Sequence, residues 1–272
     1  MLLGMHVPPV ALTIAGSDPS GGAGVQADLK TFHQHGVYGA AAITLLTVQN
    51  TRGVTAVAVQ PAGLVRDQIE AVTSDLPVAA AKTGALGSAE VVEAVAATLR
   101  GVAFPVVVDP VMISKHGAPL MDAAAQAVFA RHLVADVALL TPNAHEAQAL
   151  LGRAVTTRTE ADAAARAFVG ELGCRAVVVK GGHVDEDGDA VDVLYRRGAD
   201  APAHVRSPRI ATRHTHGTGC TYSAAIAARL ARGDELEDAV RGAKDWLTEA
   251  LRRAPGLGHG IGPVDHLTPI RR

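Results

Sequence analysis

The sequence predicts an α/β fold in which a mostly parallel central sheet is covered by helices on both faces. Short, continuous apolar runs alternate with alanine-rich stretches along the chain. Runs of this length without polar alternation are typical of strands that are buried on both faces. Each run also ends at a polar or small residue. The predicted strands are residues 10–14, 40–47, 79–82, 106–109, 137–141 and 176–180.

Polar residues mark the expected helix starts between these strands. Ser88 precedes the alanine-rich stretch 89–100 and is suited to cap it. Thr159, with Asp162 three residues later, predicts a capping box for a helix that continues to residue 172. Asp234 is expected to cap the segment that begins at Glu235. The acidic run 185–189 is interpreted as a hairpin turn before residues 190–195, with a metal site as the alternative.

Composition narrows the class of protein. The chain has 272 residues without an internal repeat or a convincing linker, so we expect a single domain over residues 1–272. A net charge of −2 argues against partners such as nucleic acid or an anionic membrane. Two unpatterned cysteines, Cys174 and Cys220, indicate a reducing compartment. Residues 1–10 lack a signal-peptide pattern, and we therefore expect a cytoplasmic protein.

Polar residues follow all six predicted strands. The carboxyl ends of parallel strands meet at one edge of a sheet, and ligands bind beyond that edge. A binding site is therefore expected there. The residues that follow the strands are Gly16-Ser17-Asp18, Gln49-Asn50, Lys82-Thr83-Gly84, Asp109-Pro110, Thr141-Pro142-Asn143 and Lys180-Gly181-Gly182-His183.

The stretch His216-Gly217-Thr218-Gly219-Cys220 carries the strongest chemical signal. Its glycines permit a tight turn, and the alanine-rich run after it predicts a helix, so backbone N–H groups would face an anion such as phosphate. Cys220 would stand at the positive end of this helix, where the pKa of a thiol tends to fall. The pattern indicates phosphoryl transfer, and the alternative is an ordinary glycine-rich helix start with a small buried cysteine.

The common nucleotide and hydrolase motifs do not account for this pattern. No segment supplies a Walker A loop or Gly-x-Ser-x-Gly, and the histidines show no zinc-ligand spacing. Residues 22–27 match the dinucleotide fingerprint formally. They lie several residues after their strand, however, and no acidic residue stands near position 44 or 45 to bind a ribose.

Several segments spread over most of the chain match one known pattern, and they are residues 11–30, 47–50, 108–112, 140–146, 179–183 and 215–221. Through these segments the chain resembles the hydroxymethylpyrimidine/phosphomethylpyrimidine kinases of thiamine biosynthesis, which belong to the ribokinase-like superfamily. The resemblance implies a three-layer α/β/α ribokinase-like fold. A sugar kinase of this superfamily would carry Asp at the position of Cys220.

The resemblance implies a bifunctional ATP-dependent kinase that phosphorylates 4-amino-5-hydroxymethyl-2-methylpyrimidine (HMP) and then its monophosphate. Residues 217–220 would form the anion hole for the transferred phosphoryl group. Cys220 would accept the proton of the substrate hydroxyl, and Lys180 would neutralise phosphate charge. Asp109 and Glu146 would organise Mg²⁺, partly through water. The nucleotide-binding residues implied are Lys180, Asn143 and Thr218.

The pyrimidine would lie among residues of the first half of the chain. Gln49 can pair with both a ring nitrogen and the amino group beside it. Gly16 and Ala23 would allow close approach of the backbone, and Asp28 would either bind the substrate or cap the following helix. Residues 114–117 would form a mobile flap over the phosphates or an ordinary loop.

One segment departs from the pattern of the family. Residues 82–86 read Lys-Thr-Gly-Ala-Leu where the family has Lys-Ile-Gly-Met-Leu. Ala85 therefore replaces a methionine that would contact the pyrimidine, and Thr83 replaces isoleucine. A larger ring could then fit, so pyridoxine or pyridoxal is the alternative substrate. A remoter alternative is a catalytically silent regulator that binds a pyrimidine or nucleotide. The family commonly forms homodimers, and a homodimer is expected here.

Overall fold

A nine-stranded sheet forms the centre of the computed structural model, which describes residues 7–115, 117–135, 137–183 and 188–270. The strand order is β3-β2-β1-β4-β5-β6-β7-β8-β9. Neighbouring strands from β2 to β7 are parallel, and the pairs β2–β3, β7–β8 and β8–β9 are antiparallel. The bounds are β1 (Val10–Ser17), β2 (Tyr38–Asn50), β3 (Gly53–Val59), β4 (Val78–Thr83), β5 (Val106–Val108), β6 (Leu139–Leu140), β7 (Ala176–Val179), β8 (Asp189–Arg196) and β9 (Ala203–Pro208).

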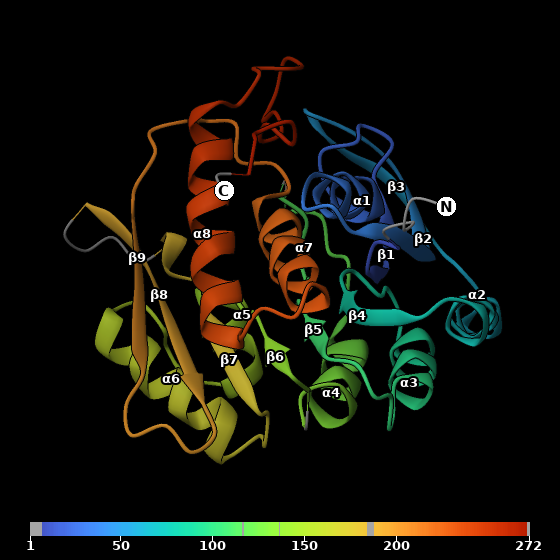
Figure 1. Ribbon diagram of the computed structural model, residues 1–272, viewed down its shortest axis with the longest axis horizontal. Helices are drawn as coiled ribbons and strands as arrows, with labels where there is room; N and C mark the ends of the chain where they lie inside the picture. Colours follow the sequence, from blue (N-terminus) through green and yellow to red (C-terminus); the bar gives the residue numbers. More distant parts are fainter. Residues whose placement is uncertain (1–6, 116, 136, 184–187, 271–272) are drawn as a thin grey trace, which may run out of the picture.

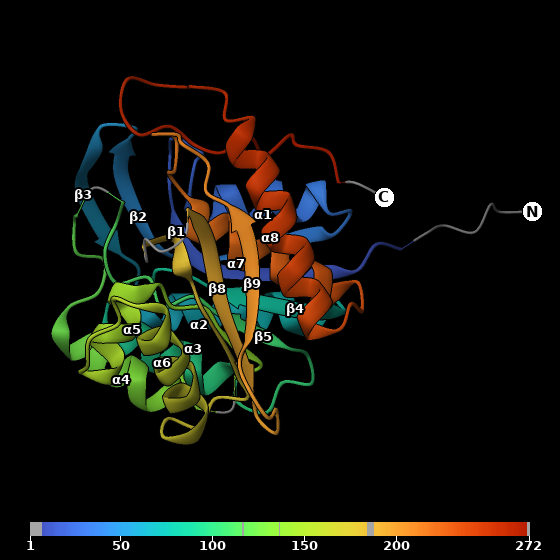
Figure 2. The same cartoon turned by 90° about the vertical axis from the view of Figure 1, so that its left-hand side faces the viewer.

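Helices cover both faces of this sheet, and each face has its own apolar core (Figures 1 and 2). Helices α1, α7 and α8 pack on one face, where Phe32, Ile226 and Trp246 are buried. Helices α2 to α6 pack on the other, around Ile69, Phe129 and similar residues. The helix bounds are α1 (Gly24–Gln34), α2 (Ala62–Asp75), α3 (Ala89–Thr98), α4 (Ala123–His132), α5 (Ala144–Leu151), α6 (Arg158–Gly170), α7 (Thr218–Ala231) and α8 (Leu236–Arg252).

The predicted α/β/α architecture is confirmed, and each of the six predicted strands is present. Sequence reasoning missed the strands at the two edges of the sheet. It did not predict β3 at one edge or β9 at the other, and for β8 it placed only a turn before residues 190–195. These antiparallel strands alternate polar and apolar residues or are exposed, so they lack the continuous apolar signal of the buried strands. Residues 185–187 of the acidic run lie outside the described residues.

Two of the three predicted helix caps are wrong. Ser88 does cap α3 by accepting the Val91 N–H. Helix α6, however, starts two residues earlier than predicted, because Thr157 and Glu160 form the reciprocal capping box that was assigned to Thr159 and Asp162.

The third predicted cap fails for a different reason. Asp234 pairs with Arg229 at 2.7 Å instead of capping α8, whose N-cap is Glu235 with no side-chain hydrogen bond. Within the described residues, no helix is both long and apolar enough to cross a membrane.

Candidate functional site

A cavity of about 680 Å³ opens at the carboxyl ends of the parallel strands. Each of the six polar strand ends identified in the sequence contributes to its wall, from Gly16 near the end of β1 to Lys180 after β7. The start of α7 closes one side, where Gly217, Thr218, Gly219 and Cys220 line the cavity. A cavity therefore lies at the edge of the sheet where a binding site is expected.

The cavity brings together all but one of the predicted site residues. Asp28 is the exception, because it is fully buried and lies outside the cavity wall. It is also not a helix cap, since it lies inside α1 and the N-cap is Ala23. The predicted residues in the wall are Gly16, Ala23, Gln49, Ala85, Asp109, Asn143, Glu146, Lys180, Gly217, Thr218, Gly219 and Cys220.

The glycine loop has the predicted conformation. Gly217 is the N-cap of α7 with a φ of 72°, in the left-handed region where glycine is favoured. Thr218, Gly219 and Cys220 follow as the first turn of the helix, whose N–H groups have no partner within the helix. The positive end of the α7 dipole therefore faces the cavity, as an anion site requires.

The thiol of Cys220 does not have the lowered pKa that its position at a helix N-terminus suggested. Desolvation by the surrounding protein raises the pKa of Cys220 to about 11, although the Lys82 ammonium and the Gly24 N–H act in the opposite direction. Asp28 and Asp109 add to the rise through their negative charges. The expected fall in pKa does not occur, because burial and the two carboxylates outweigh the Lys82 ammonium and the Gly24 N–H.

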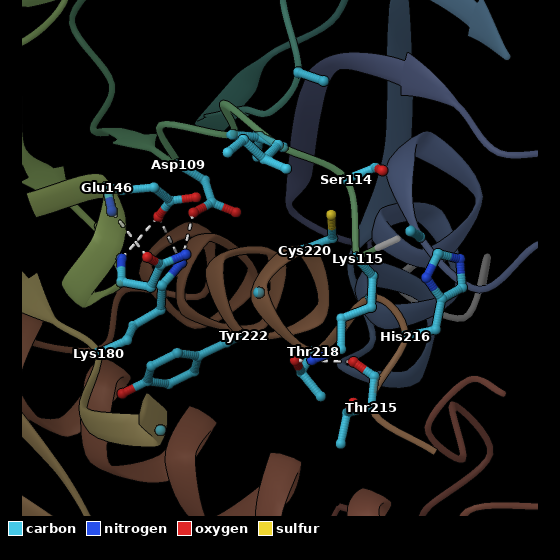
Figure 3. A pocket seen from close by; sticks show the side chains of 18 of the residues that line it. Asp109, Ser114, Lys115, Glu146, Lys180, Thr215, His216, Thr218, Cys220 and Tyr222 are labelled. Atoms are coloured by element: carbon cyan, nitrogen blue, oxygen red, sulfur yellow. Dashed lines mark hydrogen bonds and ion pairs between the residues drawn. The ribbon is translucent and has the colours of Figure 1, made fainter. Parts of the chain in front are cut away.

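Opposite Cys220, one ammonium lies between two carboxylates (Figure 3). Lys180 Nζ is 2.8 Å from Asp109 Oδ1 and 3.8 Å from Glu146 Oε2. Asp109 also accepts hydrogen bonds from Thr141 and Ser223. Burial alone would favour the neutral acid, but Lys180 and Lys82 outweigh it and hold the pKa of Asp109 below its ordinary value. Asp109 is thus an ionised group in the wall.

Glu146 combines a structural role with an excess of negative charge. It forms a capping box at the start of α5, accepting the Asn143 N–H at 2.7 Å while Asn143 accepts the Glu146 N–H. Burial, together with the charge of Asp109, raises the pKa of Glu146 to about 7 despite Lys180. Burial is the main cause of this rise, and the neighbouring Asp109 carboxylate adds to it.

These two carboxylates fit a magnesium ion. Mg²⁺ prefers oxygen ligands, usually one or two carboxylates together with water and substrate phosphates. Among the described residues there is no group of three or more His, Cys, Asp or Glu side chains that could hold a metal by themselves. A cation at Asp109 and Glu146 would therefore depend on water and on the nucleotide for its other ligands, and it would relieve the charge that raises the pKa of Glu146.

Sequence reasoning assigned no role to Lys82, which lines the cavity from β4. Its ammonium is fully buried, 2.9 Å from Asp28 Oδ2, and the same carboxylate oxygen accepts the Thr13 hydroxyl at 2.6 Å. Burial acts against the charge on Lys82, but Asp28 outweighs it and keeps the pKa above its ordinary value. The available signal was a lysine at the end of an apolar strand, two residues before a glycine, and it predicts no more than a polar strand end.

A second buried ion pair was also missed. Lys244 of α8 lies 2.8 Å from Asp192 of β8, and Asp192 also accepts the Gly181 N–H at 2.9 Å. Both residues line the cavity near Lys180 and Tyr222. Neither could be placed from the sequence, because β8 and α8 are far apart in the chain and meet only through the fold.

The opposite end of the cavity is formed by the opening segment and β2. Gln49, Thr47 and Ala85 line it together with Gly16. Thr44 donates its hydroxyl to the Ala85 carbonyl at 2.5 Å, which anchors the segment where the family pattern has methionine. Ser114 and Lys115 of the predicted flap also line the cavity, and Ser114 closes a turn with Ala118. Position 116 lies outside the described residues.

Comparisons with known proteins match most of the chain. A model of the family described as "Phosphomethylpyrimidine kinase" matches residues 18–265. A hydroxymethylpyrimidine/phosphomethylpyrimidine kinase from Synechococcus elongatus is 48% identical over 264 residues, which are 96% of this chain and 98% of that protein.

Two solved structures extend the comparison. An ADP complex of Bacillus subtilis pyridoxal kinase has a TM-score of 0.86 and 35% identity, with 96% of this chain and 98% of the other covered. A phosphomethylpyrimidine kinase from Clostridium difficile has a TM-score of 0.77 and 38% identity, with 89% and 99% covered. The chain is thus similar in structure to a pyridoxal kinase as well as to a phosphomethylpyrimidine kinase.

Proposed function

The chain belongs to the phosphomethylpyrimidine kinase family, and from this premise we propose how the residues of its cavity divide the work of catalysis. The enzyme is a hydroxymethylpyrimidine/phosphomethylpyrimidine kinase of thiamine biosynthesis. It uses ATP to phosphorylate the hydroxymethyl group of HMP and then the resulting monophosphate. One observation supports the division of roles best: a helix N-terminus, a thiol, an ammonium and two carboxylates face a single cavity.

Residues 217–220 bind the transferred phosphoryl group. The backbone N–H groups in the first turn of α7 point toward the charge that develops on its oxygens, and they are in place before the reaction begins. Lys180 and the N–H groups thus share the neutralisation of the phosphates. On the nucleotide side, Asn143 and Thr218 complete the contacts.

Cys220 acts as the base in the first step. The hydroxymethyl oxygen of HMP forms a bond to the γ-phosphorus of ATP, the bond from that phosphorus to the ADP oxygen breaks, and the hydroxyl proton passes to the thiolate form of Cys220. In the second step the attacking oxygen belongs to a phosphate that is already ionised. No base is required there, and Cys220 serves only to shape the anion loop.

Asp109 and Glu146 would hold Mg²⁺. When bound, the ion would offset the negative charge of the nucleotide phosphates. Asp109, kept ionised by Lys180 and Lys82, is the stronger of the two ligands. Glu146 keeps one carboxylate oxygen on the Asn143 N–H, so the carboxylate is held at a fixed angle by the start of α5.

The pyrimidine lies beside Gln49, whose amide group pairs with the ring nitrogen and the amino group. Gly16 and Ala23 form the wall beneath the ring. Asp28 acts on the substrate through Lys82, which lies between it and the cavity. Ala85 leaves space on the ring face where the family has methionine.

That space favours pyridoxal as a second substrate. A pyridine that bears a comparable hydroxymethyl group would present the same nucleophile to Cys220, and Ala85 removes a side chain that would oppose a larger ring. The similar fold of the Bacillus subtilis pyridoxal kinase supports this activity as an addition. A catalytically silent binder is not favoured, because every predicted catalytic group lines the cavity.

The proposal also covers assembly and location. The chain forms a single domain, two copies associate as a homodimer, and the enzyme works in the cytoplasm. The β2–β3 hairpin presents an exposed apolar face made by Leu46, Val48, Ala56 and Ala58. Leu46 pairs with Ala58 and Val48 with Ala56, so the four side chains share one face of the two strands. Because β3 is also an edge strand, a second copy of the chain is the natural partner for this surface.

The test of function is an ADP-release assay with Mg-ATP and three acceptors: HMP, its monophosphate and pyridoxal. We expect turnover of both pyrimidines and slower turnover of pyridoxal. A preference for pyridoxal would move the enzyme to vitamin B6 salvage, with Ala85 as the cause. Turnover of none of the three would refute the proposed function.

A further inference from the structure

A single carboxylate organises the loop that precedes α1. Asp18 Oδ1 accepts hydrogen bonds from both the N–H and the hydroxyl of Ser20, at 2.8 and 2.7 Å. Oδ2 accepts the N–H groups of Gly22 and Ala23, at 3.2 and 2.8 Å, and lies 2.8 Å from His216 Nε2. The first four bonds shape the loop that carries Ala23. The fifth comes from the residue immediately before the glycine that starts α7.

The direction of this last hydrogen bond follows from the charge of Asp18. Burial opposes ionisation, but the hydrogen bonds from His216 and Ser20 outweigh it and hold the pKa of Asp18 below its ordinary value. An ionised carboxylate can only accept, so His216 Nε2 is the donor. Both side chains are buried, and the link is therefore shielded from competing water.

The two loops that this pair joins are in direct backbone contact. A Cβ atom on Gly217 would lie 1.8 Å from the Gly22 carbonyl oxygen. A Cβ atom on Gly22 would lie 2.5 Å from His216 Cδ2. Any shift of the loop around Asp18 is therefore transmitted to the anion loop, because no space separates them.

The glycine-rich tail, for which the sequence suggested no role, holds His216 from the other side. The His216 N–H donates to the Gly262 carbonyl at 3.0 Å, and the backbone of His216 forms an isolated parallel β-bridge with that of Pro263. Further along the tail, His266 lies 3.1 Å from the Thr221 hydroxyl in the first turn of α7. Figure 1 shows this tail, at the red end of the colour range, running on beyond α8.

The same tail also contacts the segment that follows β2. The N–H groups of Ile261 and Gly260 donate to the carbonyl and hydroxyl of Thr51, at 2.8 and 3.2 Å. A Cβ atom on Gly260 would lie 1.9 Å from the Thr51 carbonyl oxygen, so the glycines of the tail are required for this contact. Thr51 follows β2, the strand that carries Gln49.

We propose that Asp18 and His216 are positioning residues for phosphoryl transfer: they fix the anion loop 217–220 against the substrate loop 16–24, with the C-terminal tail 258–266 as the second restraint on His216. The inference rests on the proposed function of the cavity. Loss of the His216 hydrogen bond would leave the binding groups present but misplace the anion loop. Misplacement of this kind lowers kcat more than it changes KM.

The test uses the full-length enzyme and compares His216→Leu, His216→Gln and His216→Asn. The Gln amide nitrogen can reach the position of Nε2, whereas the shorter Asn amide reaches only that of Nδ1. We expect H216L to lower kcat for both phosphorylations roughly tenfold to hundredfold with KM for ATP changed less than about threefold. H216Q should recover most of the loss and exceed H216N.

The matched control is His204→Leu. His204 Nε2 lies 2.8 Å from Asp162 Oδ1, the same pair of groups at the same distance, but between β9 and α6 and outside the cavity wall. H204L should keep the kcat of the wild type. If H216L unfolds below the assay temperature, the kcat values of H216Q and H216N provide the test of the positioning role.

Equal kcat values for H216Q and H216N, or an unchanged kcat in a folded H216L, would overturn the positioning role. An inactive wild-type enzyme would overturn the proposed function, and with it this inference. The two failures are distinguishable because only the second appears in the wild type.

Discussion

Cys220 illustrates how a residue can be placed correctly and its ionisation misjudged. It lies in the first turn of α7, as predicted, but burial and the charges of Asp28 and Asp109 raise the pKa of its thiol to about 11. A base with so high a pKa is mainly protonated at neutral pH. Only the ionised fraction can accept the hydroxyl proton, and the Lys82 ammonium favours that thiolate form.

Replacing Cys220 by Ala should separate the two phosphorylations. We expect a loss of about hundredfold or more in kcat with HMP, because the hydroxyl loses its base, and less than about fivefold with the monophosphate. Steady-state assays with each acceptor measure this. Equal losses in the two steps would refute the role of Cys220 as base.

The pH profile offers an independent check of the same group. Below a thiol pKa of about 11, the ionised fraction of Cys220 rises as pH rises. We expect kcat/KM for HMP to increase above neutral pH in the wild type and this increase to be lost in C220A. A profile for HMP with the same shape in both enzymes would contradict the expectation.

Lys82 and Asp28 form a buried ion pair whose partners depend on each other. Lys82→Met should lower the free energy of unfolding by about 3–5 kcal/mol, because it leaves the Asp28 carboxylate buried without its cation. The double variant Lys82→Met/Asp28→Asn should recover a large part of that loss. Urea unfolding of the single and double variants measures the coupling, and strictly additive losses would argue against it.

At the scale of elements, the buried parallel strands were the part most readily predicted. Their residues contact helices on both faces, so the apolar runs are continuous and unmistakable. Helix starts were less certain. Thr157 and Thr159 both precede an acidic residue at the spacing of a capping box, and only the hydrogen bonds of the folded chain select Thr157 with Glu160.

This selection can be tested by stability. Thr157→Ala should lower the free energy of unfolding by about 1 kcal/mol, since the N–H of Glu160 loses its acceptor. Thr159→Ala, an exposed change within the first turn, should alter it by less than about 0.5 kcal/mol. Chemical denaturation of both variants distinguishes them, and a larger effect at Thr159 would favour the original prediction.

At the scale of the whole molecule, the exposed apolar face of the β2–β3 hairpin calls for a partner. Val48→Asp places a charge at its centre and should convert the proposed homodimer into a monomer, as measured by sedimentation equilibrium. Leu267→Asp is the control, because Leu267 is equally apolar and 82% exposed but lies after α8. A wild-type chain that sediments as a monomer would refute the proposed dimer.

The sequence by itself determined the α/β/α class, the six parallel strands and the edge of the sheet at which the cavity opens. Those features depend on apolar periodicity and on short motifs, which are local properties of the chain. Twelve of the thirteen predicted site residues line the cavity, and Asp28 is the exception. Their assignment rested mainly on the resemblance of the sequence motifs to those of the kinase family.

Only the tertiary structure decided which distant groups meet. The pairs Lys82–Asp28, Lys244–Asp192 and His216–Asp18 join segments 54, 52 and 198 residues apart. Such pairs have no sequence period, and their ionisation depends on how much water the fold removes from each group. For the same reason the pKa of Cys220 and the contacts of the glycine-rich tail were decided by packing in three dimensions.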